Sequence, residues 1–355
     1  MLNYILIFMV SMLIGFSGVW LFNKIGILDR PGPDIIPARS PVPSIQGIFL
    51  ILGFVLLVLI FHREYFFHKE FLGLLIGGGI VGIVSVIDLF KSLSPKFRLL
   101  VQILIAVVSF MFGAGIYSFI LPNGDYYVLP VAIAVILSVI WIIGFINAVN
   151  WFDGVNSLAS GVSTIGFLTI FLLIKVVVLG YYTNVQPHDL FNLNMVANIS
   201  FILFSLGVVY TFIEFKPYGV LRDVGVMFYG FSLAYLSLLG GAKIGIMLVV
   251  LSLVIFDAVW VVFNRIFVMK KSPLKGDYSH LHYRLLTLKW TRTEVRFFVW
   301  GYSLFLMILM ILQGVNRFNK LVIFVLMFMV FFGVNYYLFW IKKMPYEYLP
   351  GKKKE

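Results

Sequence analysis

Long apolar runs, separated by short polar connections, make up most of this chain. Each run is long enough to cross a hydrocarbon core of about 30 Å as a helix that rises about 1.5 Å per residue. Apolar and polar residues do not alternate within the runs, which argues against a membrane barrel. We therefore predict an all-α integral membrane protein, a polytopic bundle of about ten or eleven transmembrane helices. The runs lie near residues 2–22, 45–61, 71–88, 98–120, 128–147, 158–180, 195–213, 224–240, 243–264, 297–315 and 320–341.

The composition supports this class and narrows the possible chemistry. Of the 355 residues, 61% are hydrophobic and only 12% are charged, which does not suit a soluble domain of this size. The chain contains no cysteine, so disulfides, thiolate metal sites and cysteine nucleophiles are excluded. The first run lacks a basic start and a cleavage site of small residues, so we expect a spanning helix there rather than a signal peptide.

Basic residues distinguish the two sides of the predicted bundle. Most of the 27 Lys and Arg residues lie in alternate connections, which the positive-inside rule places in the cytoplasm. The N-terminus is then outside and the C-terminus inside. The net charge of +12 reflects orientation and contact with anionic lipid, and does not imply a nucleic-acid partner. We expect one polytopic domain over 1–344, in which 265–296 is a cytoplasmic substrate loop, and a basic cytoplasmic tail over 345–355.

Polar residues gather at the predicted cytoplasmic helix ends, beginning with "NAVNWFDGVNSLASG" at 147–161. Asn147, Asn150 and Asp153 are spaced three apart, so on a helical segment they share one face. Three such groups suit a cation or a phosphate better than they suit lipid. An isolated Asp153 could also cap the next helix or reach for water.

Two further aspartates lie at helix ends on the same side. Asp88 is followed by a basic cluster of Lys91, Lys96 and Arg98, which suits an anionic substrate. A plain ion pair between Asp88 and Lys91 is the alternative. Asp223 begins a predicted helix, where an aspartate also satisfies free N–H groups and the helix dipole.

The stretch "GDYSHLHYRL" brings Asp277, His280, His282 and Arg284 into one basic loop. Arginine holds phosphate oxygens bidentately, and histidine can donate to them. Two histidines without further nitrogen or sulfur ligands make an incomplete zinc site. A solvated basic loop remains the alternative.

Asp257 lies inside a predicted helix, where a carboxylate must face protein or water. We expect it to line the same cavity or to pair with Arg265. Carboxylates on one membrane face suit Mg²⁺, which prefers oxygen ligands and bridges to substrate phosphates, while the basic loop suits the phosphates. Phosphoryl transfer depends mainly on such positioning and charge neutralisation, so we predict a cytoplasmic-facing active-site cleft.

Four motifs, in order along the chain, resemble those of the polyprenyl-phosphate N-acetylhexosamine-1-phosphate transferases. "NAVNWFDGVNSLASG" resembles N-A-x-N-x-x-D-G-x-D-G-L-A-x-G, and "IDLFKSLSPKFRLLVQ" resembles I-D-D-x-x-x-L-S-P-x-x-x-L-x-x-Q. "FKPYGVLRDVGVMFYGFSLA" resembles P-A-x-x-F-M-G-D-x-G-S-x-x-L-G-F-x-L-A, and "SPLKGDYSHLHYRL" resembles S-P-x-x-x-D-x-x-H-x-H-H-R-L. The H-x-H form looks more like the N-acetylglucosamine-type branch than the muramoyl-pentapeptide branch.

The resemblance implies a bacterial cytoplasmic (inner) membrane enzyme whose active site faces the cytoplasm. It implies transfer of a sugar 1-phosphate from a UDP-sugar to undecaprenyl phosphate with release of UMP. The transfer would begin a cell-envelope glycan such as lipopolysaccharide or teichoic acid. Mg²⁺ is the implied cofactor, with Mn²⁺ as a possible substitute, and a homodimer is a possible assembly.

Roles carry over by position in these motifs. Asp223 and Asp153 look like metal ligands and, with Asp88, like the catalytic carboxylates, Asp88 being the one that activates the lipid phosphate. His280, His282 and Arg284 would hold the diphosphate of the UDP-sugar. The implied substrate-binding positions are Asn147, Asn150, Asn156, Lys96, Asp277, His280, His282 and Arg284.

The departures of the chain from the motifs include four that bear on the predicted chemistry. The second aspartate of D-D is Leu89, and the second aspartate of D-G-x-D-G is Asn156. The glycine before Asp223 is Arg222, and the serine after Gly225 is Val226. Loss of two carboxylates weakens a metal site, so the alternative is a catalytically weakened relative that binds a polyprenyl phosphate or acts as a membrane scaffold. A transporter would show two matched halves with helices broken at mid-membrane, which does not fit polar groups crowded at one face.

Overall fold

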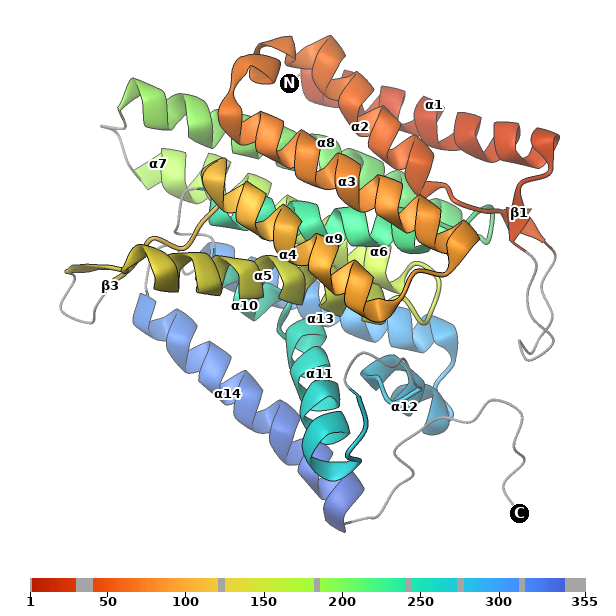
Figure 1. The fold of residues 1–355 in the computed structure, drawn as a ribbon, viewed down its shortest axis with the longest axis vertical. Coiled ribbons are helices and arrows are strands. Elements are labelled where there is room, and N and C mark those ends of the chain that lie inside the picture. The colour runs from red at the N-terminus through yellow and green to blue at the C-terminus, as the bar shows by residue number, and fades with distance from the viewer. Residues whose placement is uncertain are drawn as a thin grey trace.

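A computed structural model describes residues 2–29, 41–120, 125–181, 186–239, 244–272, 278–312 and 317–341. Helices account for nearly all of it, and two short antiparallel strand pairs complete it (Figure 1). The strands are β1 (Leu28–Asp29) with β2 (Val42–Pro43), and β3 (Ser118–Ile120) with β4 (Tyr126–Val128). The helices are α1 (Leu2–Ile25), α2 (Gly47–Phe61), η1 (Arg63–Phe67), α3 (Lys69–Lys91), α4 (Pro95–Met111), α5 (Val131–Trp151), α6 (Leu158–Leu172), η2 (Leu173–Val178), α7 (Leu179–Tyr181), α8 (Pro187–Phe215), α9 (Arg222–Leu238), α10 (Ile244–Val250), α11 (Ser252–Phe263), η3 (Asn264–Val268), α12 (Leu281–Thr287), α13 (Arg292–Leu312), α14 (Arg317–Tyr336) and η4 (Tyr337–Ile341).

The predicted polytopic all-α class is confirmed. Within the described ranges, six helical segments are long and apolar enough to span a membrane, and a seventh results if the bent pair of α10 with 252–268 is one span. Gly47–Phe61 and Leu321–Tyr336 are shorter apolar helices. Each of the eleven predicted runs contains a helix, although several are too short to meet the same length criterion.

One predicted helix, 98–120, is wrong at its C-terminal end. α4 ends at Met111, and 118–120 form β3 instead. Gly113 has a φ of 97°, in the left-handed region that glycine enters without steric cost and that ends helices. Beyond this turn the Ile116 N–H donates to Ser138 Oγ on α5 at 2.8 Å, which directs the chain away from the α4 axis.

α9 is the central helix of the bundle. All its residues from Val224 to Leu238 are buried, as expected of a helix that is hydrophobic on every side. α3 and α5 pack against it, and glycines permit the close approach that membrane helices use. A side chain at Gly77 would clash with Phe231, and one at Gly230 would clash with the backbone of α5.

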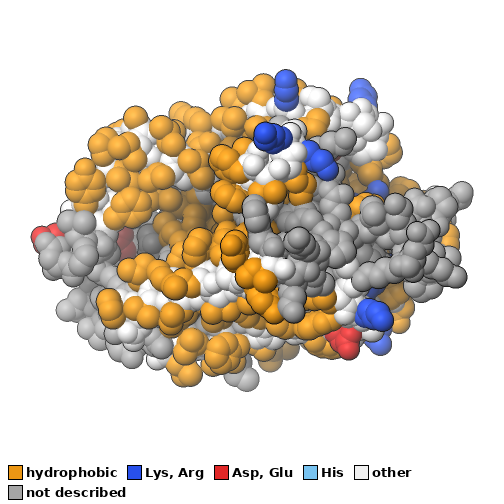
Figure 2. All heavy atoms as spheres, turned by 90° about the horizontal axis from the view of Figure 1, so that it is seen from below, with side chains coloured by type: hydrophobic (Ala, Val, Ile, Leu, Met, Phe, Trp, Pro, Cys, Tyr) orange, Lys and Arg blue, Asp and Glu red, His pale blue; other side chains and the backbone are white. Residues whose placement is uncertain are grey.

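The C-terminal third departs from the parallel packing of the other helices. α10 and α11 meet at an angle of 78°, so α11 runs across the bundle rather than along it, and α14 slants toward the lower end of α11 (Figure 1). Figure 2 shows this face of the molecule covered largely by hydrophobic side chains, with the visible Lys and Arg side chains gathered in its right-hand half. That half corresponds to the end where β1 and α12 lie in Figure 1.

Candidate functional site

The turn between α5 and α6 presents Asp153. α5 ends at Trp151, and the Asp153 N–H closes the turn by donating to Asn150 O at 3.2 Å. The Asp153 side chain is partly buried, and its Oδ1 is shielded from solvent without a hydrogen-bond partner in the described part of the chain. Burial, followed by the nearby charges of Glu214 and Asp223, raises the pKa of Asp153 well above its usual range, and Arg222 opposes this. A buried carboxylate oxygen with no partner is a site that a cation would satisfy.

Asp223 lies in the first turn of α9, close enough for its charge to affect Asp153. The capping alternative receives no support, because the cap residue is Leu221 and no side-chain cap hydrogen bond forms there. Arg222 has a φ of 58° and its Nη1 lies 3.2 Å from Asp29 Oδ1. Since a left-handed φ favours glycine, the backbone explains why the family motif has glycine before this aspartate.

Ser157, in the turn that carries Asp153, also has a left-handed backbone. Its φ is 68°, at the position where D-G-x-D-G has its second glycine. Asn156 beside it is anchored through its backbone, since Arg296 Nε donates to Asn156 O at 2.8 Å. Both turns therefore have a left-handed backbone residue, Ser157 or Arg222, at a position where the motif has glycine.

Glu214, which was not predicted from the sequence, fastens the two turns together. It lies in the last turn of α8 and is 2% exposed. Its Oε1 accepts from the Leu221 N–H at 2.9 Å, and its Oε2 accepts from Ser160 Oγ at 2.6 Å. It thus holds the start of α9, which carries Asp223, to the start of α6, which follows Asp153. A lone acid within the apolar stretch "VVYTFIEF" is the signal that could have found it.

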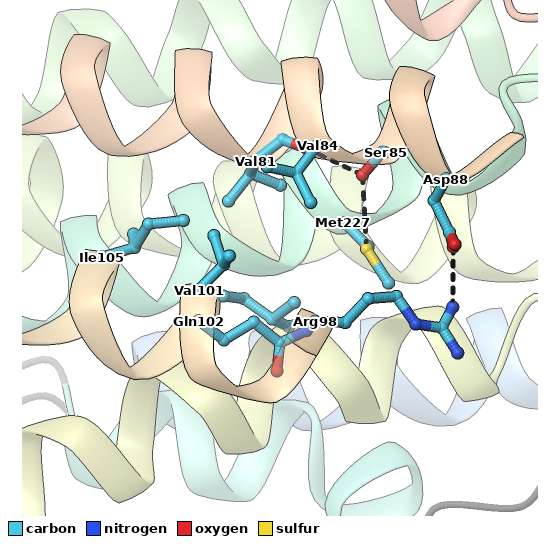
Figure 3. A pocket seen from close by; sticks show the side chains of 10 residues that line it. Val81, Val84, Ser85, Asp88, Arg98, Val101, Gln102, Ile105 and Met227 are labelled. Carbon is cyan, nitrogen blue, oxygen red and sulfur yellow. Dashed lines mark hydrogen bonds and ion pairs between the residues drawn. The ribbon is translucent and has the colours of Figure 1, made fainter. Parts of the chain in front are cut away.

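Asp88, at the C-terminal end of α3, is paired with Arg98 and not with Lys91 as the alternative supposed. Its Oδ2 lies 2.8 Å from Arg98 Nη1, and its Oδ1 accepts from the Leu93 N–H at 2.6 Å. Figure 3 shows the Asp88–Arg98 pair joining α3 to α4, with Met227 of α9 behind it. A cavity of about 20 Å³ lies under the pair. Lys96 is exposed in the first turn of α4.

A much larger cavity, of about 630 Å³, begins at Arg98 and runs between α4, α5, α11 and η3. Its polar end contains Arg98, Gln102, Asn147 and Asn150, and apolar side chains make up most of the rest. Asn147 is held there because its Nδ2 donates to Gln102 Oε1 at 2.7 Å and to Ile143 O at 2.8 Å. The two asparagines predicted to bind substrate therefore line a cavity, next to the arginine that holds Asp88.

His280, which caps the start of α12, is buried against α11. Asp257 pairs with His280 at 2.8 Å and with Arg284 at 2.6 Å, and not with the predicted partner Arg265. Arg265 Nη2 lies 3.5 Å from His280 Nε2 instead. The prediction went wrong because 257 and 265 are two turns apart on one element, whereas the chain after η3 folds back and brings α12 to Asp257. His280 also contacts Trp151, a cavity-lining residue, at 5.9 Å between ring centroids.

His282 is fully buried, and both its ring nitrogens lack partners among the described residues. Burial, and then the neighbouring His280, lower the pKa of His282 to about 3, so the ring is neutral at pH 7. A side chain at Gly154 would clash with this ring and with the Tyr283 hydroxyl, so the Asp153 turn lies directly against α12. A buried imidazole without a partner among the described residues is a candidate for binding a polar group.

These contacts join three groups of residues into one region. The carboxylate turns meet α12 at Gly154, α12 meets the large cavity at Trp151, and the cavity meets Asp88 at Arg98. Asp277 falls outside the described residues. No group of three or more His, Cys, Asp or Glu side chains that could hold a metal occurs in the described ranges. Mg²⁺ is bound through one or two carboxylates with substrate phosphates supplying further oxygens, so Asp153 and Asp223 fit such an ion.

Comparisons with known proteins agree with the motifs. A model of glycosyl transferase family 4 matches residues 71–241. The chain is 28% identical over 275 residues to "Probable undecaprenyl-phosphate N-acetylglucosaminyl 1-phosphate transferase" of Bacillus subtilis (strain 168), covering 74% of this chain and 70% of the relative. It is 27% identical over 300 residues to the phospho-N-acetylmuramoyl-pentapeptide-transferase of Staphylococcus saprophyticus, covering 77% and 85%. A similarly named Staphylococcus aureus (strain MSSA476) protein is 30% identical over 151 residues, covering 38% and 47%. The resemblance to the family is confirmed.

Proposed function

We propose, from the similarity to glycosyl transferase family 4 over residues 71–241, that the chain transfers a sugar 1-phosphate from a UDP-sugar to undecaprenyl phosphate. UMP is released and a cell-envelope glycan begins, at the cytoplasmic face of the bacterial inner membrane. N-acetylglucosamine 1-phosphate is the proposed group, because the Bacillus subtilis relative is named for that sugar. The observation that carries the proposal is the unpartnered buried oxygen of Asp153, placed beside Asp223 and against α12.

The proposed reaction is one displacement at phosphorus. An oxygen of the lipid phosphate attacks the sugar-bearing phosphorus of the donor. The bond from that phosphorus to the bridging oxygen breaks, and the oxygen leaves with UMP. A divalent cation, Mg²⁺ or Mn²⁺, bound by Asp153 and Asp223, would neutralise the diphosphate oxygens in this step.

The protein's own residues would position the two substrates. His282, on α12, would donate a ring N–H to the diphosphate, and His280 lies beside it with Arg265 Nη2 3.5 Å from its Nε2. Asn147 and Asn150 would bind at the polar end of the large cavity, whose apolar length suits a polyprenyl chain. Arg98, at the same end, would exchange Asp88 for the lipid phosphate and leave Asp88 free to take up a phosphate proton.

A purified-enzyme assay tests this proposal. Protein in lipid nanodiscs is given radiolabelled UDP-N-acetylglucosamine, undecaprenyl phosphate and Mg²⁺, and lipid-linked product is measured. UDP-N-acetylmuramoyl-pentapeptide is the second donor, since two relatives carry that name. We expect product with the first donor and a loss of about 10²-fold or more in Asp153→Asn and Asp223→Asn, from removal of a charge that stabilises the transition state.

Asp189→Asn is the matched control. It makes the same chemical change at an exposed position in the first turn of α8, at the opposite end from Glu214, and should keep wild-type activity. Product formed only from the muramoyl donor would correct the sugar. Absence of product from folded protein with every UDP-sugar would reject catalysis and favour the binding or scaffold role, for which the loss of acids at Leu89 and Asn156 argues.

A further inference from the structure

Asp257 is a deeply buried charged side chain near α12 that the proposed reaction does not use. It lies on α11 and is 1% exposed. Its Oδ2 is 2.8 Å from His280 Nδ1, and its Oδ1 accepts from the Leu281 N–H at 2.7 Å and from Arg284 Nη2 at 2.6 Å. A carboxylate inside an apolar helix is costly unless it is paired in this way. Both of its oxygens are therefore committed to the start of α12.

The pairing fixes the chemistry of His280. An ionised carboxylate can only accept hydrogen bonds, so His280 Nδ1 must carry the proton that faces Asp257. Nε2 is then a hydrogen-bond acceptor, and Arg265 Nη2 lies 3.5 Å from it. Arg284 balances the charge of Asp257, so the imidazole need not be cationic to keep the contact. His280 itself is 4% exposed and contacts Trp151 on the wall of the large cavity.

Asn335 holds the same group from the opposite side. It lies near the end of α14 and is 4% exposed. Its Nδ2 donates to Phe331 O at 2.7 Å, which turns its Oδ1 toward Arg284, and Arg284 Nη1 donates to that oxygen. A chain of contacts thus runs from α14 through Arg284 and Asp257 to His280. All of it lies beyond the 71–241 segment that the family model matches.

We propose that Asp257 is a positioning residue that holds His280 in the Nδ1–H tautomer, so that Nε2 stays a hydrogen-bond acceptor for the Arg265 guanidinium 3.5 Å away, and that Asn335 supports it through Arg284. Neither Asp257 nor Asn335 needs to touch substrate. The inference rests on the proposed function, because it assigns the donor diphosphate to the α12 side, where the His280–Arg265 pair lies. Partners that orient a ligating histidine typically change affinity or activity by about 10- to 100-fold when they are removed.

The test combines a tautomer measurement with kinetics. Histidine side chains are labelled with ¹⁵N, the chain has five histidines, and His280→Gln identifies the His280 signal. In the wild type we expect the Nδ1–H tautomer. In Asp257→Asn the new amide donates to Nδ1, so the proton should move to Nε2. Transferase kcat should fall about 10- to 100-fold, with Asp189→Asn unchanged.

Asn335 provides a variant that keeps the carboxylate. Asn335→Ala should also lower kcat, by a smaller factor than Asp257→Asn does. The control is Asn198→Ala, which removes an asparagine of α8 that hydrogen-bonds to Tyr4 and Tyr65 and should leave kcat unchanged. In the His280→Gln background, Asp257→Asn should have little further effect on kcat, because residues that act as a unit are not additive.

The outcomes separate the two proposals. A wild type without transferase activity rejects the proposed function, while the tautomer of His280 still decides the positioning claim. An active wild type in which Asp257→Asn leaves both the tautomer and kcat unchanged rejects the positioning claim alone. If Asp257→Asn does not fold, full activity in Asn335→Ala together with the Nε2–H tautomer in the wild type would overturn it.

Discussion

Replacement of Glu214 by alanine should release the two turns that carry Asp153 and Asp223. Glu214 is 2% exposed and accepts hydrogen bonds from the Leu221 N–H and from Ser160 Oγ. Hydrogen bonds to a charged group contribute about 1.5–3 kcal/mol each, so Glu214→Ala should lower the free energy of unfolding by about 3–6 kcal/mol. Glu214→Gln keeps an oxygen for Leu221 and should cost much less.

Intrinsic fluorescence is the suitable assay, since the chain has seven tryptophans and no cysteine for a thiol dye. Thermal unfolding of the detergent-solubilised protein is compared for wild type, Glu214→Ala, Glu214→Gln and Ser160→Ala. Ser160→Ala removes one of the two bonds and should show an intermediate loss. In the double variant Ser160→Ala should add little to Glu214→Ala, because both remove the same contact. A Glu214→Ala midpoint within about a degree of the wild type would refute the role of Glu214 as the fastener, given that about 1 kcal/mol shifts Tm by a few degrees.

Three further predictions concern neighbouring groups. Arg98→Gln removes the partner of Asp88 and should raise KM for undecaprenyl phosphate by about 10-fold or more, as expected for a lost charged hydrogen bond; an unchanged lipid KM would contradict it. Arg222→Gly should unfold at the wild-type temperature or above it, and Arg222→Ala below it, because a left-handed residue costs about 1–2 kcal/mol and the partly exposed pair with Asp29 is worth about 0–1 kcal/mol. His282 has its pKa lowered to about 3, so unfolding below pH 6.5 takes up a proton that the folded state excludes. Stability should fall by about 1.4 kcal/mol per pH unit from pH 6.5 toward 3, and this slope, measured by denaturation at several pH values, should shrink in His282→Gln.

Hydropathy was sufficient to locate every main helix because burial in lipid needs only a long apolar run. Hydropathy did not predict where a helix ends when the backbone angle of one residue changes the direction of the chain. Gly113 ends α4 early, and nothing in the apolar pattern of 98–120 marks that residue apart from its type. The apolar pattern of 243–264 likewise predicts one continuous helix, whereas the structure bends sharply between α10 and α11.

The candidate site was predictable in part for a similar reason. Asp88, Asp153 and Asp223 stand out as acids at helix ends, and topology alone places them on one side. Their partners depend on tertiary contacts that spacing does not reveal. Lys91 is nearer to Asp88 in sequence than Arg98 is, yet α4 folds back and presents Arg98. Asp257 meets α12 rather than Arg265 for the same reason.

The break between α10 and α11, after Val250, lies just beyond the end of the family match. The family match ends at 241, and the residues that fix His280 all follow the break. The group that orients His280 therefore belongs to a C-terminal segment that turns by 78° from α10 before it begins. Under the proposed function, a chimaera cut at Leu251 would exchange this segment while the helices that carry Asp88, Asp153 and Asp223 stay in place, and its choice of UDP-sugar would show whether the segment sets the donor.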